Sequence, residues 1–390
     1  MMTHPRKVQC VAPCRVPELD GLRGLAILAV LLHTFSPLQG HEFPVKEFKL
    51  ALDLGWVGVQ LFFVLSGFLI SGILLDSQGS PGYLRNFLAR RALRIFPLYY
   101  GVLIMAFLVL PAVSPTVASW RSAFGHEAWL WTYLANWVQA DWTNTRPFAH
   151  FWSLCVEEQF YLLWPLLLWR MRPVRVIQTC AFLMLAAPLI RALMIWHGAD
   201  PEAVYMITVC RMDALAAGAA GAALVRLPGG SQGCVDRMAS VRWLVCGALV
   251  AVALMSHVYE RLHPVTQVVG YSLFSLAFAV LVLDCVRHDG SAGTWRRPLR
   301  MTLLGSVGRY SYAMYIFGPL LEKTLGAHIL ARGFEGASQH LVPGLGYCLL
   351  MVMLTYGCGW LSFRLYERHF LALKAHFTPS SEVRSLLRSG

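Results

Sequence analysis

The segment LGWVGVQLFFVLSGFLISGILL, residues 54–75, carries no charged side chain over 22 consecutive positions. A helix needs about 20 apolar residues to cross the hydrocarbon core of a bilayer, so this segment predicts a membrane span. The rest of the chain is similar, because its 390 residues are 57% hydrophobic and 14% charged, with a mean hydropathy of +0.54. This composition excludes a soluble globular protein, a disordered chain and a disulfide-stabilised scaffold.

Apolar stretches of comparable length recur along the chain without the alternation that is typical of strands. We therefore predict an all-α integral membrane protein with about ten transmembrane helices, at 22–39, 54–76, 95–113, 151–169, 176–196, 204–225, 243–259, 265–286, 302–322 and 341–363. The predicted organisation is a cytoplasmic N-terminal segment, a transmembrane domain and a cytoplasmic tail, at 1–21, 22–366 and 367–390.

Positive charge alternates between the segments that flank these spans. One set of six segments, which includes both termini, holds 22 Lys and Arg residues, whereas the other five segments hold seven. Cytoplasmic loops carry the excess of Lys and Arg, so both termini are predicted to lie in the cytoplasm and the protein in a bacterial inner membrane. The same distribution accounts for the formal net charge of +12, so a lipid bilayer is the expected partner and nucleic acid is not.

Cysteine and tryptophan positions add two expectations. The five segments predicted to face outward contain none of the ten cysteines, so no disulfide is expected within them. Cys10 and Cys14 form a lone pair, whereas a structural zinc site needs four ligands, so no metal site is predicted. The longest outward segment, 114–150, is rich in tryptophan, which is typical of an interfacial belt and, alternatively, of a platform for a sugar ring.

Ionisable residues inside membrane spans are costly, so each is a candidate for function. In the first span, Arg23 lies at the inner end and His33 in the outer half, about 15 Å apart along a helix axis. A histidine at this depth suits general-base catalysis, because its ordinary pKa of about 6.5 lets it accept a hydroxyl proton at neutral pH. The alternative is a buried histidine that is hydrogen-bonded to a neighbouring helix.

The fourth predicted span contains two adjacent carboxylates, Glu157 and Glu158. Neighbouring residues on a helix point about 100° apart, so these two cannot face one site in the same way. Ser153, Glu157 and Tyr161 share one helix face at a spacing of four, and we expect this face to turn inward. The alternative for Glu157 is a solvated carboxylate at the membrane interface.

Arginines supply the remaining candidates. Arg211 and Asp213 in the sixth span lie about 200° apart on a helix, so each needs a partner on another span, and structural pairing is favoured over a substrate contact. Three arginines near the start of the third span serve either as a topology signal or as phosphate ligands, because guanidinium groups match phosphate oxygens bidentately; they are Arg90, Arg91 and Arg94. These residues alone fit transacylation and ion-coupled transport equally well.

Four blocks of sequence, in order, resemble membrane acyltransferase family 3: LDGLRGLA at 19–26, FFVLSGFLI at 62–70, RRALRIFPLY at 90–99 and FWSLCVEEQFY at 151–161. The similarity extends over nearly the whole chain through weaker matches, RMDAL at 211–215, SYAMY at 311–315 and YER at 366–368. The chain resembles the stand-alone envelope glycan O-acyltransferases that lack a fused hydrolase-like domain. The resemblance implies transfer of an acyl group, acetyl first of all, from cytoplasmic acyl-CoA to a hydroxyl of an extracytoplasmic glycan or glycoside.

The resemblance also implies roles for individual residues. It makes His33 the catalytic base or a transient acyl carrier, and Glu157 the carboxylate that orients the imidazole or the acceptor. The implied acyl-CoA ligands are Arg23, Arg90, Arg91 and Arg94. The residues implied to contact the acceptor or support the site are Ser153, Tyr161, Arg211 and Asp213. Acyl-CoA is expected as a donor substrate, with no permanently bound cofactor and no metal.

Two positions depart from the family pattern. Ten residues usually separate its arginine from its histidine, whereas nine separate Arg23 from His33, and one residue turns a regular helix by about 100°. Gly318 also occupies the place of a late histidine. A proton-coupled transporter or flippase of envelope precursors is the main alternative function, and a non-catalytic glycan-binding scaffold is a third. The sequence leaves the acceptor open among lipopolysaccharide, exopolysaccharide, peptidoglycan and a small glycoside.

Overall fold

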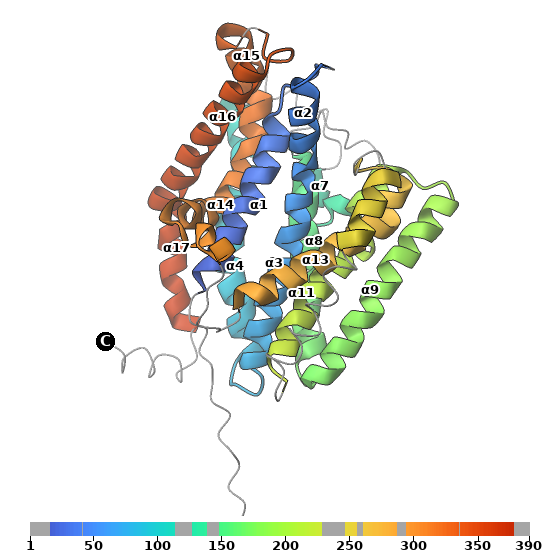
Figure 1. The fold of residues 1–390 in the computed structure, drawn as a ribbon. Coiled ribbons are helices and arrows are strands. Elements are labelled where there is room, and N and C mark those ends of the chain that lie inside the picture. The colour runs from blue at the N-terminus through green and yellow to red at the C-terminus, as the bar shows by residue number, and fades with distance from the viewer. Residues whose placement is uncertain are drawn as a thin grey trace, which may run out of the picture.

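A computed structural model describes residues 16–40, 42–113, 127–138, 148–227, 246–255, 260–286, 294–334 and 336–377. Within these ranges every regular element is helical, which confirms the predicted all-α class (Figure 1). The longer helices are α1 (Pro17–Phe35), α3 (Val57–Asp76), α4 (Tyr83–Ile104), α8 (Trp152–Leu168), α9 (Pro173–Trp196), α11 (Met212–Val225), α13 (Tyr271–Val286), α14 (Thr302–Leu321) and α16 (Leu341–Ser362).

Shorter helices extend or connect these. Several join a longer helix directly, so that the 3₁₀ segment η5 (Thr208–Arg211) leads into α11 and the π-helix η9 (Glu322–Gly326) follows α14. The others include α2 (Val45–Asp53), η1 (Leu54–Trp56), η2 (Met105–Val109), α5 (Leu110–Val113), α7 (Glu127–Trp131), η3 (Ala135–Trp137), η4 (Ala149–Phe151), α10 (Pro201–Met206), η6 (Thr266–Gly270), η7 (Thr294–Arg296), η8 (Pro298–Arg300), α15 (Ala327–Gly333), η10 (Phe363–Glu367), α17 (Arg368–Ala372) and η11 (Leu373–Phe377).

Membrane crossing is supported by length and composition for six helical segments within the described ranges. These segments are Val45–Asp76, Tyr83–Ala112, Pro173–Trp196, Thr208–Val225, Thr266–Val286 and Leu341–Phe377. The predicted first, fourth and ninth spans correspond to α1, α8 and α14, which are more polar or shorter. In the predicted seventh span the structure describes the apolar helix Cys246–Met255.

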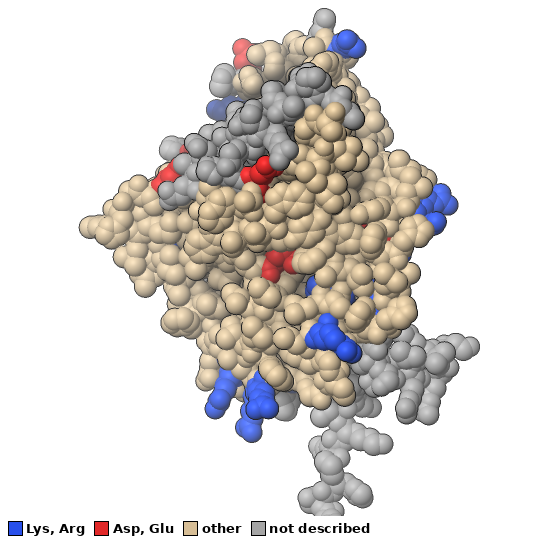
Figure 2. All heavy atoms as spheres, turned by 180° about the vertical axis from the view of Figure 1, so that it is seen from behind, with Lys and Arg blue, Asp and Glu red and all other residues tan. Residues whose placement is uncertain are grey.

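The surface of the bundle matches a lipid environment. On α9, Leu185 is 74% exposed and Leu189 is 61% exposed, which in water would leave large apolar side chains without cover. The face in Figure 2 is uncharged over most of its middle, and several Lys and Arg side chains lie toward its lower end. This distribution is the one expected of a polytopic membrane protein.

The segments predicted to lie in the cytoplasm meet at one end of the bundle. Gln78 donates a hydrogen bond to the carbonyl of Leu168 at 2.6 Å, and Arg226 pairs with Asp76 at 2.5 Å. The segments predicted to face outward meet at the other end through the pairs Gln39–Ser338, Asn136–Thr208 and Arg261–Glu202. The helix directions therefore agree with the alternation of Lys and Arg in the sequence.

Glycines allow the two central helices α3 and α11 to approach closely. A Cβ on Gly67 would lie 2.0 Å from the carbonyl oxygen of Leu215, and one on Gly218 would lie 2.0 Å from that of Val64. No larger residue fits at either position without displacing backbone. Small residues at helix interfaces are the usual means of close packing in membrane proteins.

The first helix begins earlier than predicted, and the predicted cytoplasmic tail is helical in part. α1 starts at Pro17 rather than at residue 22, because proline suits the first helical turn and the buried Glu18 is neutralised by Arg300 at 2.5 Å. At the other end, η10, α17 and η11 continue to Phe377 along α4, where Tyr366 donates to the carbonyl of Pro97 at 3.2 Å. These stretches contain polar residues, so their hydropathy did not predict that they are helical.

Candidate functional site

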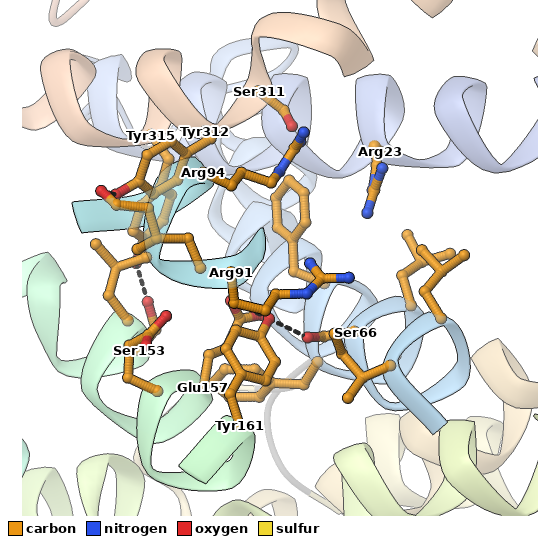
Figure 3. Close-up of a pocket in the computed structure, with 18 of the residues that line it drawn as sticks. Arg23, Ser66, Arg91, Arg94, Ser153, Glu157, Tyr161, Ser311, Tyr312 and Tyr315 are labelled. Atoms are coloured by element: carbon orange, nitrogen blue, oxygen red, sulfur yellow. Dashed lines mark hydrogen bonds between the residues drawn. The ribbon is translucent and has the colours of Figure 1, made fainter. Parts of the chain in front are cut away.

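A cavity lies within the bundle between α1, α3, α4, α8 and α14 (Figure 3), and the space between its lining atoms, open solvent included, is about 860 Å³. α1, α8 and α14 are the predicted spans that are more polar or shorter than the other membrane helices, and some of their polar residues line the cavity, among them Arg23, Glu157 and Ser311. Part of the polarity of these helices therefore lies at one internal site.

Three arginines give the cavity a positive charge. Arg23 on α1 and Arg91 and Arg94 on α4 all line it, and their guanidinium groups project from opposite sides in Figure 3. Arg23 lies 3.8 Å from Asp20, whereas no hydrogen bond or ion pair joins Arg91 or Arg94 to another described residue. Unpaired guanidinium groups in a cavity are suited to an anionic ligand, and above all to phosphate groups.

The cavity also contains a chain of hydrogen bonds that ends on a carboxylate. The hydroxyl of Tyr161 donates to Oε2 of Glu157 at 3.0 Å, and Oγ of Ser66 on α3 lies 2.5 Å from the Tyr161 hydroxyl. The Cζ atom of Arg91 lies 5.6 Å from the centre of the Tyr161 ring. All four groups line the same cavity, so a carboxylate, two hydroxyls and a cation are available to one ligand.

A second pair of hydroxyls lines the cavity nearer to α14. Oγ of Ser153 lies 2.6 Å from the hydroxyl of Tyr315, which donates to the backbone carbonyl of His150 at 2.8 Å. Ser153 also donates to the carbonyl of His150, at 3.3 Å. This pair therefore ends on a backbone carbonyl, which cannot accept a proton in catalysis.

Both adjacent carboxylates reach the cavity. The sequence led us to expect that only Glu157 would, but Glu158 also lines it, because the cavity contacts more than one face of α8. Oε1 of Glu158 is buried and has no hydrogen-bond partner within the described residues. The predicted inward face of α8 is present in the structure, with Ser153, Glu157 and Tyr161 all at the cavity.

His33 is not among the residues that line this cavity. It lies further along α1, where a Cβ on Gly55 would come within 2.8 Å of the His33 Cβ, and where Asp53 and Arg261 are its charged neighbours. Its Nδ1 is buried without a hydrogen-bond partner in the described part of the chain. The structure therefore brings Glu157 to the arginines and places His33 nearer the end that is predicted to face outward.

Arg23 and His33 lie on one regular helix, so the number of residues between them determines which faces they occupy. α1 runs from Pro17 to Phe35 without interruption, and ten residues rotate an α-helix to within about 80° of the starting direction. The two side chains consequently point to different faces, and no bulge restores a common one. The other departure from the family pattern is Gly318. Leu31 occupies the space that a side chain at this position would need, because a Cβ on Gly318 would lie 2.3 Å from Cδ2 of Leu31.

The sixth predicted span carries a buried ion pair that the sequence did not reveal in full. Asp213 accepts from Arg191 on α9 at 2.9 Å and from Ser272 on α13 at 2.7 Å, and neither side chain of the ion pair is exposed. Arg191 also donates to the backbone carbonyl of Cys210. Partners on other spans were expected for Asp213, but Arg191 itself was missed, although a charged residue within an apolar helix was the available signal.

Arg211 has no such partner. Its side chain is fully buried, and none of its three guanidinium nitrogens has a hydrogen-bond partner within the described residues. Its Cζ instead lies near the centres of four aromatic rings, those of Tyr271 at 4.4 Å, Tyr205 at 4.7 Å, Trp152 at 5.5 Å and Phe63 at 5.6 Å. Cation–π contacts therefore replace the ion pair that was expected.

One predicted residue lies outside the cavity, and one residue that was not predicted lines it. Arg90 does not line the cavity, although Arg91 and Arg94 do. Ser66 was not singled out because a serine in an apolar helix commonly bonds to its own backbone. Within the described residues no cluster of three or more His, Cys, Asp or Glu could hold a metal, and Cys10 and Cys14 lie outside them.

The sequence matches the profile of a known family, described as an acyltransferase domain, over residues 16–363. Among curated proteins it is 26% identical over 379 residues to the peptidoglycan O-acetyltransferase OatA of Listeria monocytogenes, which covers 90% of this chain and 55% of that protein. It is 29% identical over 332 residues to the putative peptidoglycan O-acetyltransferase YrhL of Bacillus subtilis, covering 77% and 48%.

A third relative, the O-acetyltransferase OatA of Staphylococcus aureus, is 25% identical over 319 residues, which is 78% of this chain and 50% of that protein. The chain thus spans about half the length of the curated relatives that it matches. No solved structure is significantly similar to it.

Proposed function

The chain belongs to the acyltransferase family whose domain spans residues 16–363, and from this premise we propose that it transfers an acetyl group from acetyl-CoA to a hydroxyl of an envelope glycan. Peptidoglycan is the first acceptor to test, because two of the relatives are named as peptidoglycan O-acetyltransferases, one of them as putative. The proposed location is a bacterial inner membrane, with the donor arriving from the cytoplasm and the acceptor from outside.

One observation carries this proposal. Three arginines and two carboxylates line a single cavity in the membrane bundle; they are Arg23, Arg91, Arg94, Glu157 and Glu158. The three cations suit the phosphates of CoA, and the carboxylates suit a reaction in which a hydroxyl loses its proton. A proton relay through the membrane has no need of three arginines in the same cavity, so this arrangement favours acyl transfer over transport.

The proposed role of each residue follows from its position relative to the cavity. The arginines hold the donor and orient its thioester, and this orientation supplies a large part of the rate in a site that excludes water. Glu157 is the general base in the cavity, and Tyr161 connects it to the hydroxyl of Ser66. His33 acts on the acceptor side, since it lies beyond the cavity near Asp53 and Arg261.

Transfer of labelled acetyl from acetyl-CoA to peptidoglycan, measured with the purified protein in lipid nanodiscs, tests the proposal. We expect Arg94→Ala to raise the KM for acetyl-CoA roughly 10- to 100-fold, the loss of one charged hydrogen bond of about 1.5–3 kcal/mol. His33→Ala should lower transfer without that rise in KM. Arg85→Ala is the matched control, because Arg85 lies on the same helix but is exposed outside the cavity.

Two outcomes would count against the proposal. An equal KM for Arg94→Ala and the wild type would remove the donor site from this cavity. Absence of transfer by the wild type to every glycan, from every acyl-CoA tried, would favour the proton-coupled transporter or flippase instead.

A further inference from the structure

Two pairs of hydroxyl groups line the cavity. Hydrogen bonds connect only one of these pairs to a group that can act as a base. Ser153 and Tyr315 end on the carbonyl of His150, whereas Ser66 is connected through Tyr161 to the carboxylate of Glu157. A hydroxyl becomes a nucleophile when an adjacent group can take its proton. Ser66 is therefore distinguished from the other serines of the cavity by its connection to Glu157.

The direction of the hydrogen bonds is determined by the number of protons. A tyrosine hydroxyl has one proton to donate, and that of Tyr161 is donated to Glu157 at 3.0 Å. The proton in the 2.5 Å contact between Ser66 and Tyr161 must then come from Ser66. The chain runs from Ser66 to Tyr161 to Glu157, which is the order needed to remove a proton from Ser66.

The surroundings of Ser66 complete a nucleophile site. Ser66 lines the cavity and keeps 7% of its surface exposed there, and its neighbour Gly67 packs against the backbone of Leu215, which holds this turn of α3 in place. Figure 3 shows Arg23 and Arg91 on the same side of the cavity as Ser66. Their positive charge favours the oxyanion that forms when a thioester carbonyl is attacked.

The position of His33 points to the same residue. His33 packs against Gly55, and Ser66 lies eleven residues further along the continuous helical segment Val45–Asp76. At 1.5 Å per residue this separates their levels by about 16 Å. A thioester at the arginines is therefore beside Ser66 and far from His33.

We propose that Ser66 is the catalytic nucleophile and carries the acyl group as an ester between donor and acceptor. This inference rests on the proposed function. In the first step Oγ of Ser66 bonds to the thioester carbonyl carbon and the carbon–sulfur bond breaks. The proton leaves Ser66 through Tyr161 and Glu157 and is delivered to the CoA sulfur, which departs as the thiol. In the second step the acceptor hydroxyl attacks the ester, and its proton replaces the one that Ser66 lost.

Two measurements without acceptor test this proposal on the full chain in nanodiscs. Acetyl-CoA alone should leave one acetyl group on Ser66, detected by mass spectrometry of the digested protein. Labelled CoA should exchange into unlabelled acetyl-CoA, because formation of an acyl-enzyme is reversible. Ser66→Ala should lower this exchange by at least about 10³-fold, and Tyr161→Phe by roughly 10²-fold or more.

Ser71→Ala is the matched control for structural damage. Ser71 lies on the same helix, is buried, and also bonds to α8, through Trp164 at 2.7 Å, but it does not line the cavity. We expect this variant to exchange CoA at the wild-type rate. Loss of exchange in both serine variants, with no acetyl on Ser66 of the wild type, would mean that the hydroxyl is structural and would overturn the proposal.

The remaining outcomes separate this inference from the proposed function. A wild type that acetylates glycan but carries no acetyl on Ser66, and a Ser66→Ala variant that acetylates it equally well, would overturn the nucleophile and leave the acyltransferase. Acetyl found on His33 or on another residue would also overturn it. A wild type that transfers to no acceptor and exchanges no CoA would overturn both.

Discussion

Arg191 and Asp213 form an ion pair with no exposure on either side chain. Burial makes such a pair costly to form but still more costly to break, because removal of one partner leaves an isolated charge. Ser272 and the carbonyl of Cys210 add hydrogen bonds to it. The pair therefore ties α9, α11 and α13 together more firmly than an exposed pair would.

Asp213→Ala is accordingly expected to destabilise the protein by about 3–5 kcal/mol. Thermal unfolding in detergent, followed by loss of a monodisperse gel-filtration peak, measures the change relative to the wild type. Lys49→Ala is the control, since the Lys49–Asp53 pair is 37% and 44% exposed and exposed pairs contribute about 0–1 kcal/mol. Equal effects of the two variants would contradict the structural role of the buried pair.

At the same scale, the sequence predicted the residues of the cavity that lie on one helix better than those that meet across helices. The face shared by Ser153, Glu157 and Tyr161 follows from helix periodicity. The bond between Ser66 and Tyr161 joins residues 95 positions apart, and no local pattern encodes such a contact. The roles of His33 and Glu157 stay predictions, because the structure gives their positions and not their chemistry.

At the scale of elements, the pairing of α3 with α11 depends on Gly67 and Gly218. Each glycine faces a carbonyl oxygen of the other helix, 2.0 Å from where its Cβ would stand. Backbone cannot yield as the end of a side chain can, so the two helices would have to separate. The cavity lies beside this interface, because Ser66 precedes Gly67 on α3.

Gly218→Val should therefore lower the yield of folded protein severely, with a loss of at least about 1–3 kcal/mol from overpacking. The measurement is the fraction of expressed protein that runs as a monodisperse species after extraction. Gly357→Ala provides the comparison, because nothing lies within 4 Å of a Cβ at Gly357 on α16, and alanine favours a helix over glycine by about 1 kcal/mol. Similar losses for both would argue against close packing of α3 on α11.

Element boundaries were predicted well where hydropathy alone decides them. The span at 54–76 ends at Asp76, as α3 does. The start of α1 and the helices after Phe363 were missed, because buried Glu18 and the polar residues of α17 look like loop to a hydropathy pattern. The helix α2 was missed for the same reason, since its mixed residues 45–53 continue directly into the next span.

At the scale of the whole molecule, the alternation of helix directions can be tested from outside the cell. Cysteine introduced at Gln339, exposed at the end predicted to face outward, should react with a membrane-impermeant thiol reagent. Cysteine introduced at Pro81, exposed at the opposite end, should react only after the cells are opened. The native background is low, because the outward segments hold no cysteine. Reaction of Pro81→Cys in intact cells would reverse the topology.

The buried charge of Arg211 also affects how well the membrane keeps ions from leaking across it. An arginine keeps its positive charge at any ordinary pH, and this one is enclosed by the rings of Phe63, Trp152, Tyr205 and Tyr271, of which Phe63 also lines the cavity. A fixed cation buried within the bundle repels protons and metal ions that approach it, as arginines do in water channels. A bundle that contains a polar cavity can thus keep the membrane potential intact.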